Sequence, residues 1–151
     1  MKTEDRYDSL IRYYAERFGR NPLQVKRQIR AESSFNPDAK SPAGCYGLAQ
    51  FNMMTWSQWW DGDSDLDPPP ADLTRSINPQ DPEDAILALC AYMASLEKRF
   101  GSLAYALAAY NWGPGHMSKL LSAQYSLADT PKETQDYVAK CLAFAQEVLV
   151  C

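Results

Sequence analysis

The sequence predicts a single, mainly α-helical domain with a small irregular β or loop element near its first third. Apolar residues recur with a spacing near 3.6 through most of the chain, and no long stretch alternates with period two. The length of 151 residues is close to that of one ordinary domain. A composition of 46 % hydrophobic and 23 % charged residues is typical of a folded chain. We therefore treat residues 1–151 as one domain.

The first two helices carry clear end signals. The apolar spacing predicts a helix from about Glu4 to Phe18. Asn21 and Pro22 predict the start of the next helix, because an N-cap side chain is followed by proline at the first helical position. That helix should run to about Ser33, and Pro37 restricts the chain beyond it.

The rest of the chain alternates loops and helices. Glycine, proline and serine between 38 and 50 predict the irregular element, a short helix follows from 53, and the acidic, proline-containing stretch 61–81 predicts a surface loop. A long helix should then cover Pro82–Phe100, with an apolar stripe formed by Ile86, Leu89, Cys90, Met93, Leu96 and Phe100.

Three further helices are expected after residue 101. Ser102 should cap a short apolar helix that ends near Trp112, and a second should cover 116–125. The last should run to about residue 150, with Thr130 as its cap, Pro131 at its first position and Glu133 completing a capping box.

Charge and hydropathy exclude some classes of protein. A net charge of −4 and a pI near 4.9 argue against nucleic-acid binding, which needs a basic surface. The longest apolar-rich run spans residues 85–96, too short to cross a hydrocarbon core of about 30 Å. We therefore expect no membrane insertion. The polar N-terminus lacks the apolar core of a signal peptide.

The four cysteines do not predict a metal site or structural disulfides. Cys45, Cys90, Cys141 and Cys151 have no CxxC spacing, and the chain contains one histidine. Without a signal peptide, reduced thiols are favoured. Cys90 and Cys141 lie on apolar helix faces, as small core residues do. We expect no metal and no cofactor.

Glu32 is the residue best placed for proton transfer. It follows Val25 and Ile29 at helical spacing, so it lies on the apolar face of its helix. Desolvation there would raise its pKa and allow it to donate a proton at neutral pH. The alternative is a solvated glutamate paired with Arg27 or Arg30.

Aromatic and amide side chains suggest a sugar site, since rings cover C–H faces while amides bind hydroxyl or acetamido groups. Tyr110 and Trp112 flank Asn111, and Trp56 begins a run that contains three of the four tryptophans. The alternative, for at least two of these tryptophans, is core packing. His116 has no evident catalytic partner.

Several motifs occur together in an order that resembles the soluble lytic transglycosylase domain of the lysozyme-like superfamily, which includes the goose-type lysozymes. The resemblance covers about residues 8–145. Its motifs are Glu32-Ser33, Asn36-Pro37, Ser41-Pro42-Ala43-Gly44, Gly47-Leu48-Ala49-Gln50, Asp81-Pro82-Glu83-Asp84, Ala109-Tyr110-Asn111-Trp112-Gly113-Pro114-Gly115, Glu133-Thr134 and Tyr137-Val138.

The resemblance implies a lysozyme-like α+β fold and cleavage of the β-1,4 bond between N-acetylmuramic acid and N-acetylglucosamine in peptidoglycan. It implies that Glu32 is the single catalytic acid and base, which makes a 1,6-anhydro product without water. The residues implied to contact the glycan are Ser41, Gln50, Tyr110, Asn111, Glu133 and Tyr137, to which the aromatic pattern adds Trp112 and Trp56.

The chain departs from the family pattern at three positions. Ala49 replaces a usual methionine and should loosen one wall of the groove. Trp112 replaces a small residue and should add bulk, and Asn52 replaces an apolar residue.

Two other functions stay open. One is a hydrolytic muramidase that activates water with Asp38 or with an aspartate of the loop (Asp61, Asp63, Asp65 or Asp67). The other is a non-catalytic glycan-binding module of a virion or secretion apparatus. The expected partner is the peptidoglycan glycan strand, bound by a monomer at the cell wall or periplasm. Without a leader, the chain suits a phage lysis or virion protein, a domain delivered by another system, or an enzyme whose leader was removed.

Overall fold

A computed structural model describes residues 2–64 and 66–143, and it shows a mainly helical domain with one small antiparallel sheet. In chain order its elements are η1 (Thr3–Asp5), α1 (Asp8–Arg17), α2 (Pro22–Ser33), β1 (Cys45–Tyr46), β2 (Phe51–Asn52), α3 (Met53–Trp60), α4 (Pro82–Phe100), α5 (Leu103–Trp112), α6 (Pro114–Ser122), η2 (Leu127–Asp129) and α7 (Lys132–Leu142). The fold class predicted from the sequence is confirmed.

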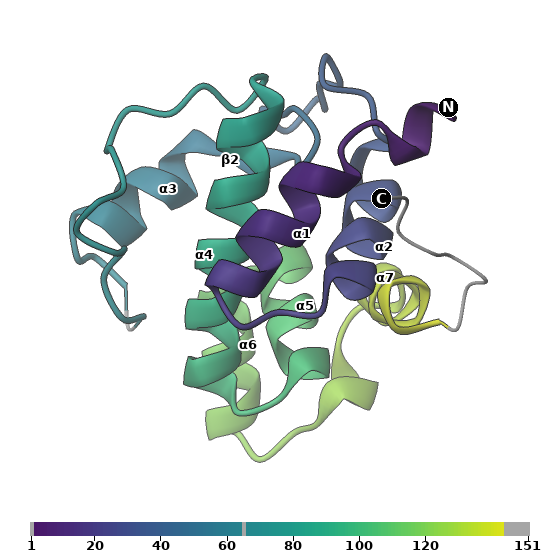
Figure 1. Cartoon of the computed structure of the whole chain (residues 1–151). Helices are drawn as coiled ribbons and strands as arrows, with labels where there is room; N and C mark the ends of the chain where they lie inside the picture. The colour runs from purple at the N-terminus through teal and green to yellow at the C-terminus, as the bar shows by residue number, and fades with distance from the viewer. Residues whose placement is uncertain (1, 65, 144–151) are drawn as a thin grey trace.

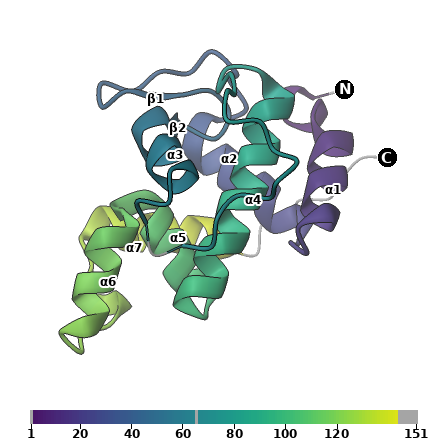
Figure 2. The same cartoon turned by 90° about the vertical axis from the view of Figure 1, so that its left-hand side faces the viewer.

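The long helix α4 runs through the centre of the molecule (Figures 1 and 2). Helices α1 and α5 pack against it, α2 packs against α1 and α7, and α5 also contacts α6 and α7. The predicted stripe of α4 forms the core, since all six of its residues are buried. In Figure 1, α3 lies on the opposite side of α4 from α7.

Side chains cap the N-termini of α2, α4 and α5, and the caps of α2 and α5 are those that the sequence predicts. Asn21 Oδ1 accepts a hydrogen bond from Leu23 N (2.9 Å) at the start of α2. Asp81 Oδ1 accepts from Asp84 N (2.9 Å) at the start of α4, and the Ser102 hydroxyl caps α5. Each cap satisfies a backbone donor that has no partner inside its helix.

The single first helix predicted from Glu4 to Phe18 is wrong at its beginning. The chain forms the short η1 and starts α1 only at Asp8. Glu4 pairs with Arg30, and Asp5 pairs with Lys26 (2.8 Å). Both cations belong to α2, so these pairs hold the N-terminal turn against that helix.

The predicted capping box of the last helix is also wrong. The Thr130 hydroxyl donates to Leu127 O (2.7 Å), and the capping box forms instead between Ser126 and Asp129 of η2. Helix α7 begins two residues after Thr130. Its predicted extension toward residue 150 lies outside the described residues.

The two-stranded sheet forms a tight hairpin after α2. Cys45 pairs with Asn52, and Tyr46 pairs with Phe51. Gly47 follows β1 with φ of +81°, and a Cβ atom there would lie 1.7 Å from the carbonyl oxygen of Pro79. Only glycine allows this close approach between the hairpin and the segment before α4.

Residues 61–64 and 66–81 form the predicted loop, and ion pairs join it to helices α1 and α4 and to itself. Asp72 pairs with Arg17 of α1, Asp67 pairs with Lys98 of α4, and Asp61 pairs with Arg75 (2.6 Å). These contacts fix the loop along one side of the molecule.

Cys45, Cys90 and Cys141 are free thiols, and the last two are buried as predicted. Cys151 lies outside the described residues. None of the described helices is both long enough and apolar enough to span a membrane.

Candidate active site

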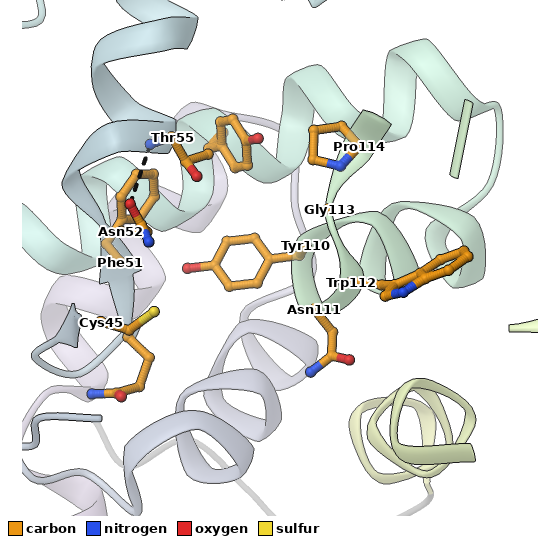
Figure 3. Close-up of a pocket in the computed structure, with 11 residues that line it drawn as sticks. Cys45, Phe51, Asn52, Thr55, Tyr110, Asn111, Trp112, Gly113 and Pro114 are labelled. Atoms are coloured by element: carbon orange, nitrogen blue, oxygen red, sulfur yellow. Dashed lines mark hydrogen bonds between the residues drawn. The ribbon is translucent and has the colours of Figure 1, made fainter. Parts of the chain in front are cut away.

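A groove opens between the hairpin, α3 and the junction of α5 with α6 (Figure 3). We call it the central pocket. Its lining residues are Cys45, Gln50, Phe51, Asn52, Thr55, Tyr92, Tyr110, Asn111, Trp112, Gly113 and Pro114. None of them is acidic or basic, so the pocket is suited to a neutral polar ligand with apolar faces.

Glu32 lies in the last turn of α2 and is partly buried. Its carboxyl group makes no hydrogen bond or ion pair with any residue that the structure describes, because Arg30 turns to Glu4 instead. Burial alone raises the pKa of Glu32 to about 8. The side chain is therefore protonated at neutral pH, and the solvated, Arg-paired alternative does not describe it.

Glu32 does not line the central pocket, but its charge acts on Tyr110, which does. Burial raises the pKa of Tyr110 well above its usual value, and the charge of Glu32 raises it further. The same two causes raise the pKa of Tyr137. Glu32 thus lies within electrostatic range of both tyrosines, and Tyr110 connects it to the pocket.

Tyr110 crosses the pocket from α5 toward Cys45 (Figure 3). Its hydroxyl group donates to Ala49 O (2.7 Å), which fixes the ring. The side chain of Ala49 is fully buried and does not line the central pocket, and the effect of this departure on the wall of the groove stays a prediction.

Asn111 is held by a residue that the sequence reasoning missed. Its Oδ1 accepts a hydrogen bond from Thr134 Oγ1 (2.9 Å) on α7. Thr134 is 1 % exposed, so this bond is shielded from water. Because Oδ1 is occupied, the Nδ2 donors of Asn111 are left for a ligand. The Glu133-Thr134 motif contained the signal, but it does not show which side chain Thr134 meets.

Gln50 and Ser41 both shape the loop around the hairpin. Gln50 has φ of +51°, and its Nε2 donates to Ala39 O (3.1 Å) and Gly47 O (3.0 Å). Its Oε1 is left for a ligand in the pocket. Ser41 Oγ accepts from Cys45 N (3.1 Å), and Ser41 does not line the central pocket.

The two residues of α7 that were predicted to contact the glycan differ in burial. Tyr137 is buried within electrostatic range of Glu32, and its hydroxyl group accepts a hydrogen bond from Gln28 Nε2 (3.1 Å). Gln28 is a second residue that the sequence reasoning missed, one helical turn before Glu32. Glu133 is exposed in the first turn of α7 and does not line the central pocket.

The tryptophans divide into packing residues and a pocket wall. Trp56 is 1 % exposed, packs edge-on against Phe51 and Trp59, and donates its indole N–H to Arg75 O (2.7 Å). Because it is buried, the Trp56 ring has no exposed surface for a sugar. Trp56 and Trp59 are therefore core-packing residues, as the alternative interpretation predicted. Trp112 lines the pocket and points away from Cys45 (Figure 3).

The departure at Asn52 has a local structural reason. Its Oδ1 accepts hydrogen bonds from Met54 N (2.9 Å) and Thr55 N (3.4 Å), which caps α3. An apolar residue would leave these donors without a protein partner. The same side chain lines the central pocket, as Figure 3 shows.

Four of the five aspartates proposed to activate water, Asp38, Asp61, Asp63 and Asp67, do not line the central pocket, and Asp65 lies outside the described residues. Asp38 is exposed and does not line the central pocket, while Asp61 and Asp67 are held in ion pairs. Among the described residues, no group of three or more His, Cys, Asp or Glu side chains could hold a metal ion.

A family model for the transglycosylase SLT domain matches residues 9–132. This span includes Glu32 and every residue that lines the central pocket, whereas Glu133 and Tyr137 follow it.

Solved structures that resemble the chain include those of two lytic transglycosylases. One is an inactive glutamate-to-glutamine mutant of the lytic transglycosylase Slt from Pseudomonas aeruginosa, with 24 % identity and a TM-score of 0.69 over 91 % of this chain. The other is the 70 kDa soluble lytic transglycosylase from Escherichia coli, with 26 % identity and a TM-score of 0.71 over 90 % of this chain. The match covers 23 % of each of those proteins.

Proposed function

Because the chain belongs to the transglycosylase SLT family, we propose that it is a peptidoglycan lytic transglycosylase. It cleaves the β-1,4 bond between N-acetylmuramic acid and N-acetylglucosamine and leaves a 1,6-anhydro-muramic acid end. The observation that carries this proposal is the carboxyl group of Glu32, which has no partner among the described residues, has a pKa near 8, and acts electrostatically on Tyr110 of an uncharged polar pocket.

In the first step, Glu32 donates its proton to the glycosidic oxygen as the bond to the anomeric carbon breaks. The N-acetylglucosamine leaves with a free 4-hydroxyl group. Positive charge develops at the anomeric carbon, and the oxygen of the substrate's own 2-acetamido group stabilises it. Such help replaces the second carboxylate that most glycosidases use.

In the second step, the Glu32 carboxylate takes the proton of the C6 hydroxyl group of the same muramic acid. The C6 oxygen attacks the anomeric carbon and displaces the acetamido oxygen, which closes the anhydro bridge. Glu32 is protonated again, and no water is consumed. Burial favours the neutral form that starts and ends this cycle.

The side chains of the pocket supply the binding groups. The Nδ2 donors of Asn111 and the ring of Tyr110 position the acetamido group, and Gln50 Oε1 accepts from a sugar hydroxyl group. Such a substrate places the protein's action at the cell wall or periplasm.

Mass spectrometry of digested peptidoglycan tests the proposal. Anhydro-muropeptides from the wild type, and none from Glu32→Gln, are expected. Products heavier by one water would assign a hydrolytic muramidase instead. No cleavage of isolated cell walls at any pH from about 4 to 8 would leave a glycan-binding module.

A further inference from the structure

A row of polar side chains leads along one face of α2 to Glu32. Gln24, Gln28 and Glu32 are spaced four residues apart, so they lie on the same side of the helix. Gln24 is 4 % exposed and Gln28 is 0 % exposed. Side-chain amides are rarely buried to this extent, because burial removes their hydrogen bonds to water. Helix α2 packs here against α7 (Figure 1).

The two glutamines use their amide groups differently. Gln24 Oε1 accepts a hydrogen bond from Arg20 Nη2 (2.6 Å), which lies one turn away from Glu32's end of the helix. Gln28 Nε2 donates to the hydroxyl group of Tyr137 (3.1 Å). Only the second of these bonds reaches a residue that the charge of Glu32 acts on.

Packing alone does not explain an amide at Gln28. Its Oε1 is buried and has no hydrogen-bond partner among the residues that the structure describes. An acceptor buried without a partner costs free energy, which offsets the gain from the bond made by Nε2. A methionine of similar length would fill the same space without that cost. The amide is therefore explained better by what it does to Tyr137.

The bond from Gln28 restricts the hydroxyl proton of Tyr137. Because the Tyr137 oxygen accepts from Nε2, its own proton points away from Gln28. Three titratable groups act on this hydroxyl group, namely Glu32 of α2, Tyr110 of α5 and Cys141 of α7. Burial raises the pKa of the Cys141 thiol to about 12, so it is neutral, and its sulfur is a weak acceptor.

The other tyrosine near Glu32 has no proton to spare. The hydroxyl group of Tyr110 donates to Ala49 O (2.7 Å). When Glu32 has given up its proton, its carboxylate is a stronger acceptor for the Tyr137 hydroxyl group than the thiol is. A hydroxyl group that already accepts from an amide is polarised and donates more strongly.

We propose that Gln28 is a positioning residue, which holds the Tyr137 hydroxyl group with its proton toward Glu32 and so stabilises the carboxylate that forms between the two steps. Gln28 does not line the central pocket, so it acts through Tyr137 and not on the glycan. The proposal rests on the function proposed above, but the effect of Gln28 on Glu32 can be measured without substrate.

A ¹³C NMR titration of the full chain follows the Glu32 carboxyl carbon, with Glu32→Gln assigning its signal. Gln28→Met should raise the midpoint by about one pH unit, because the carboxylate loses stabilisation while the neutral acid does not. Tyr137→Phe should raise the midpoint at least as far. The double variant should titrate like Tyr137→Phe alone, since Gln28 acts through that hydroxyl group.

Gln24→Met is the matched control, because it replaces a buried amide one turn earlier on the same face. It removes the bond to Arg20, so the denaturant midpoint of unfolding should fall while the Glu32 titration stays unchanged. Gln28→Met should unfold close to the wild-type midpoint, because it removes one buried hydrogen bond and one unpaired acceptor together.

Kinetics on isolated peptidoglycan should agree with the titration. Gln28→Met should lower kcat about tenfold with KM unchanged, since the loss concerns the reacting carboxyl group and not the binding of the glycan. The alkaline limb of its kcat/KM profile should move upward together with the titration midpoint, because that limb reports the acid of the free enzyme.

Other outcomes would overturn the proposal. An unchanged Glu32 midpoint in Gln28→Met would refute the positioning role, as would shifts that add in the double variant. If Gln28→Met does not fold, an unchanged midpoint in Tyr137→Phe is sufficient to refute it. Shifted midpoints together with no anhydro product from the wild type would support the arrangement around Glu32 and refute the proposed function alone.

Discussion

Each half of α2 contains a titratable side chain removed from water, and the surroundings favour the charged form in the first half and the neutral form in the second. In the first half, Lys26 is 1 % exposed, and its Nζ lies 2.8 Å from Asp5 and 2.9 Å from Asp8. Burial acts to lower the pKa of Lys26, but these partners outweigh it, and the pKa is raised. In the last turn, burial raises the pKa of Glu32, and no partner among residues 2–64 and 66–143 opposes it.

This difference separates a structural charge from the group that we propose to be reactive. The ammonium group of Lys26 keeps its charge and holds the N-terminal turn on α2. In the proposed mechanism, the carboxyl group of Glu32 keeps its proton until it transfers it to the substrate. Burial is common to both, so the presence of partners decides which role a titratable group takes.

Removing the carboxyl group should have the largest effect. Glu32→Gln keeps the shape of the protonated acid but cannot transfer a proton, so lytic activity should fall by about 10²–10⁴-fold. The measurement is clearing of isolated cell walls, with exposed Glu16→Gln as the matched control. Retention of more than about one hundredth of the activity would contradict catalysis by Glu32.

Removing the buried cation should affect stability instead. Lys26→Met leaves the Asp8 carboxylate buried without its partner, which should lower the free energy of unfolding by about 3 kcal/mol. Denaturant unfolding measures this, with Lys140→Met as the control. Adding Asp8→Asn to Lys26→Met should restore part of the loss, and additive losses would show that the two groups are not coupled.

The pH dependence of stability should report the proton on Glu32. The unfolded carboxyl group ionises near pH 4.5, and the folded one near 8, so the folded state binds more protons between these values. Stability therefore falls as pH rises through this window. Relative to Glu32→Gln, the free energy of unfolding of the wild type should fall by about 2 kcal/mol between pH 5 and pH 8. A fully buried group could contribute up to ~1.4 kcal/mol per pH unit, and the smaller value is expected because Glu32 is partly exposed.

Thermal or denaturant unfolding of both proteins across that pH range checks this expectation. If the two curves stay parallel, the carboxyl group is ionised in the folded state, and the contrast with Lys26 disappears.

The smallest effect should come from removing the hydrogen bond that holds the side chain of Asn111. Thr134→Val removes the hydroxyl group that holds Asn111 Oδ1, which should lower kcat about tenfold through misplacement of the amide. The loss of stability should be about 1 kcal/mol. Thr134→Ser keeps the hydroxyl group and should restore kcat, whereas a serine variant as slow as valine would contradict the positioning role.

Local signals were enough to predict much of the fold. Asn21 and Pro22 specify the start of α2 within three residues, and its bounds are those predicted. The same helical spacing placed Glu32 on the apolar face, which its raised pKa bears out. The errors arose where distant groups compete. Thr130 has the right neighbours for a cap, but its hydroxyl bonds to Leu127.

The hydrogen bonds that hold Asn111 and Tyr137 could not be predicted from the sequence, because they also join groups that are far apart in the chain. Thr134 lies 23 residues from Asn111, and Gln28 lies 109 residues from Tyr137. No periodicity pairs residues at such distances, because α2 and α7 meet only in the folded chain. Trp56 is an error of the opposite kind. Its place in an aromatic run suggested a surface for a sugar, but the sequence does not show that packing covers the ring.

The contact between Gly47 and Pro79 offers a way to engineer the width of the groove. A methyl group at position 47 would collide with the Pro79 carbonyl oxygen, so the hairpin would have to move away from the segment before α4. Gln50 and Phe51 would move with it, since both belong to the hairpin and line the central pocket. The absence of a side chain at Gly47 therefore sets how closely the hairpin approaches Pro79, and with it the width of the groove that we propose binds a glycan.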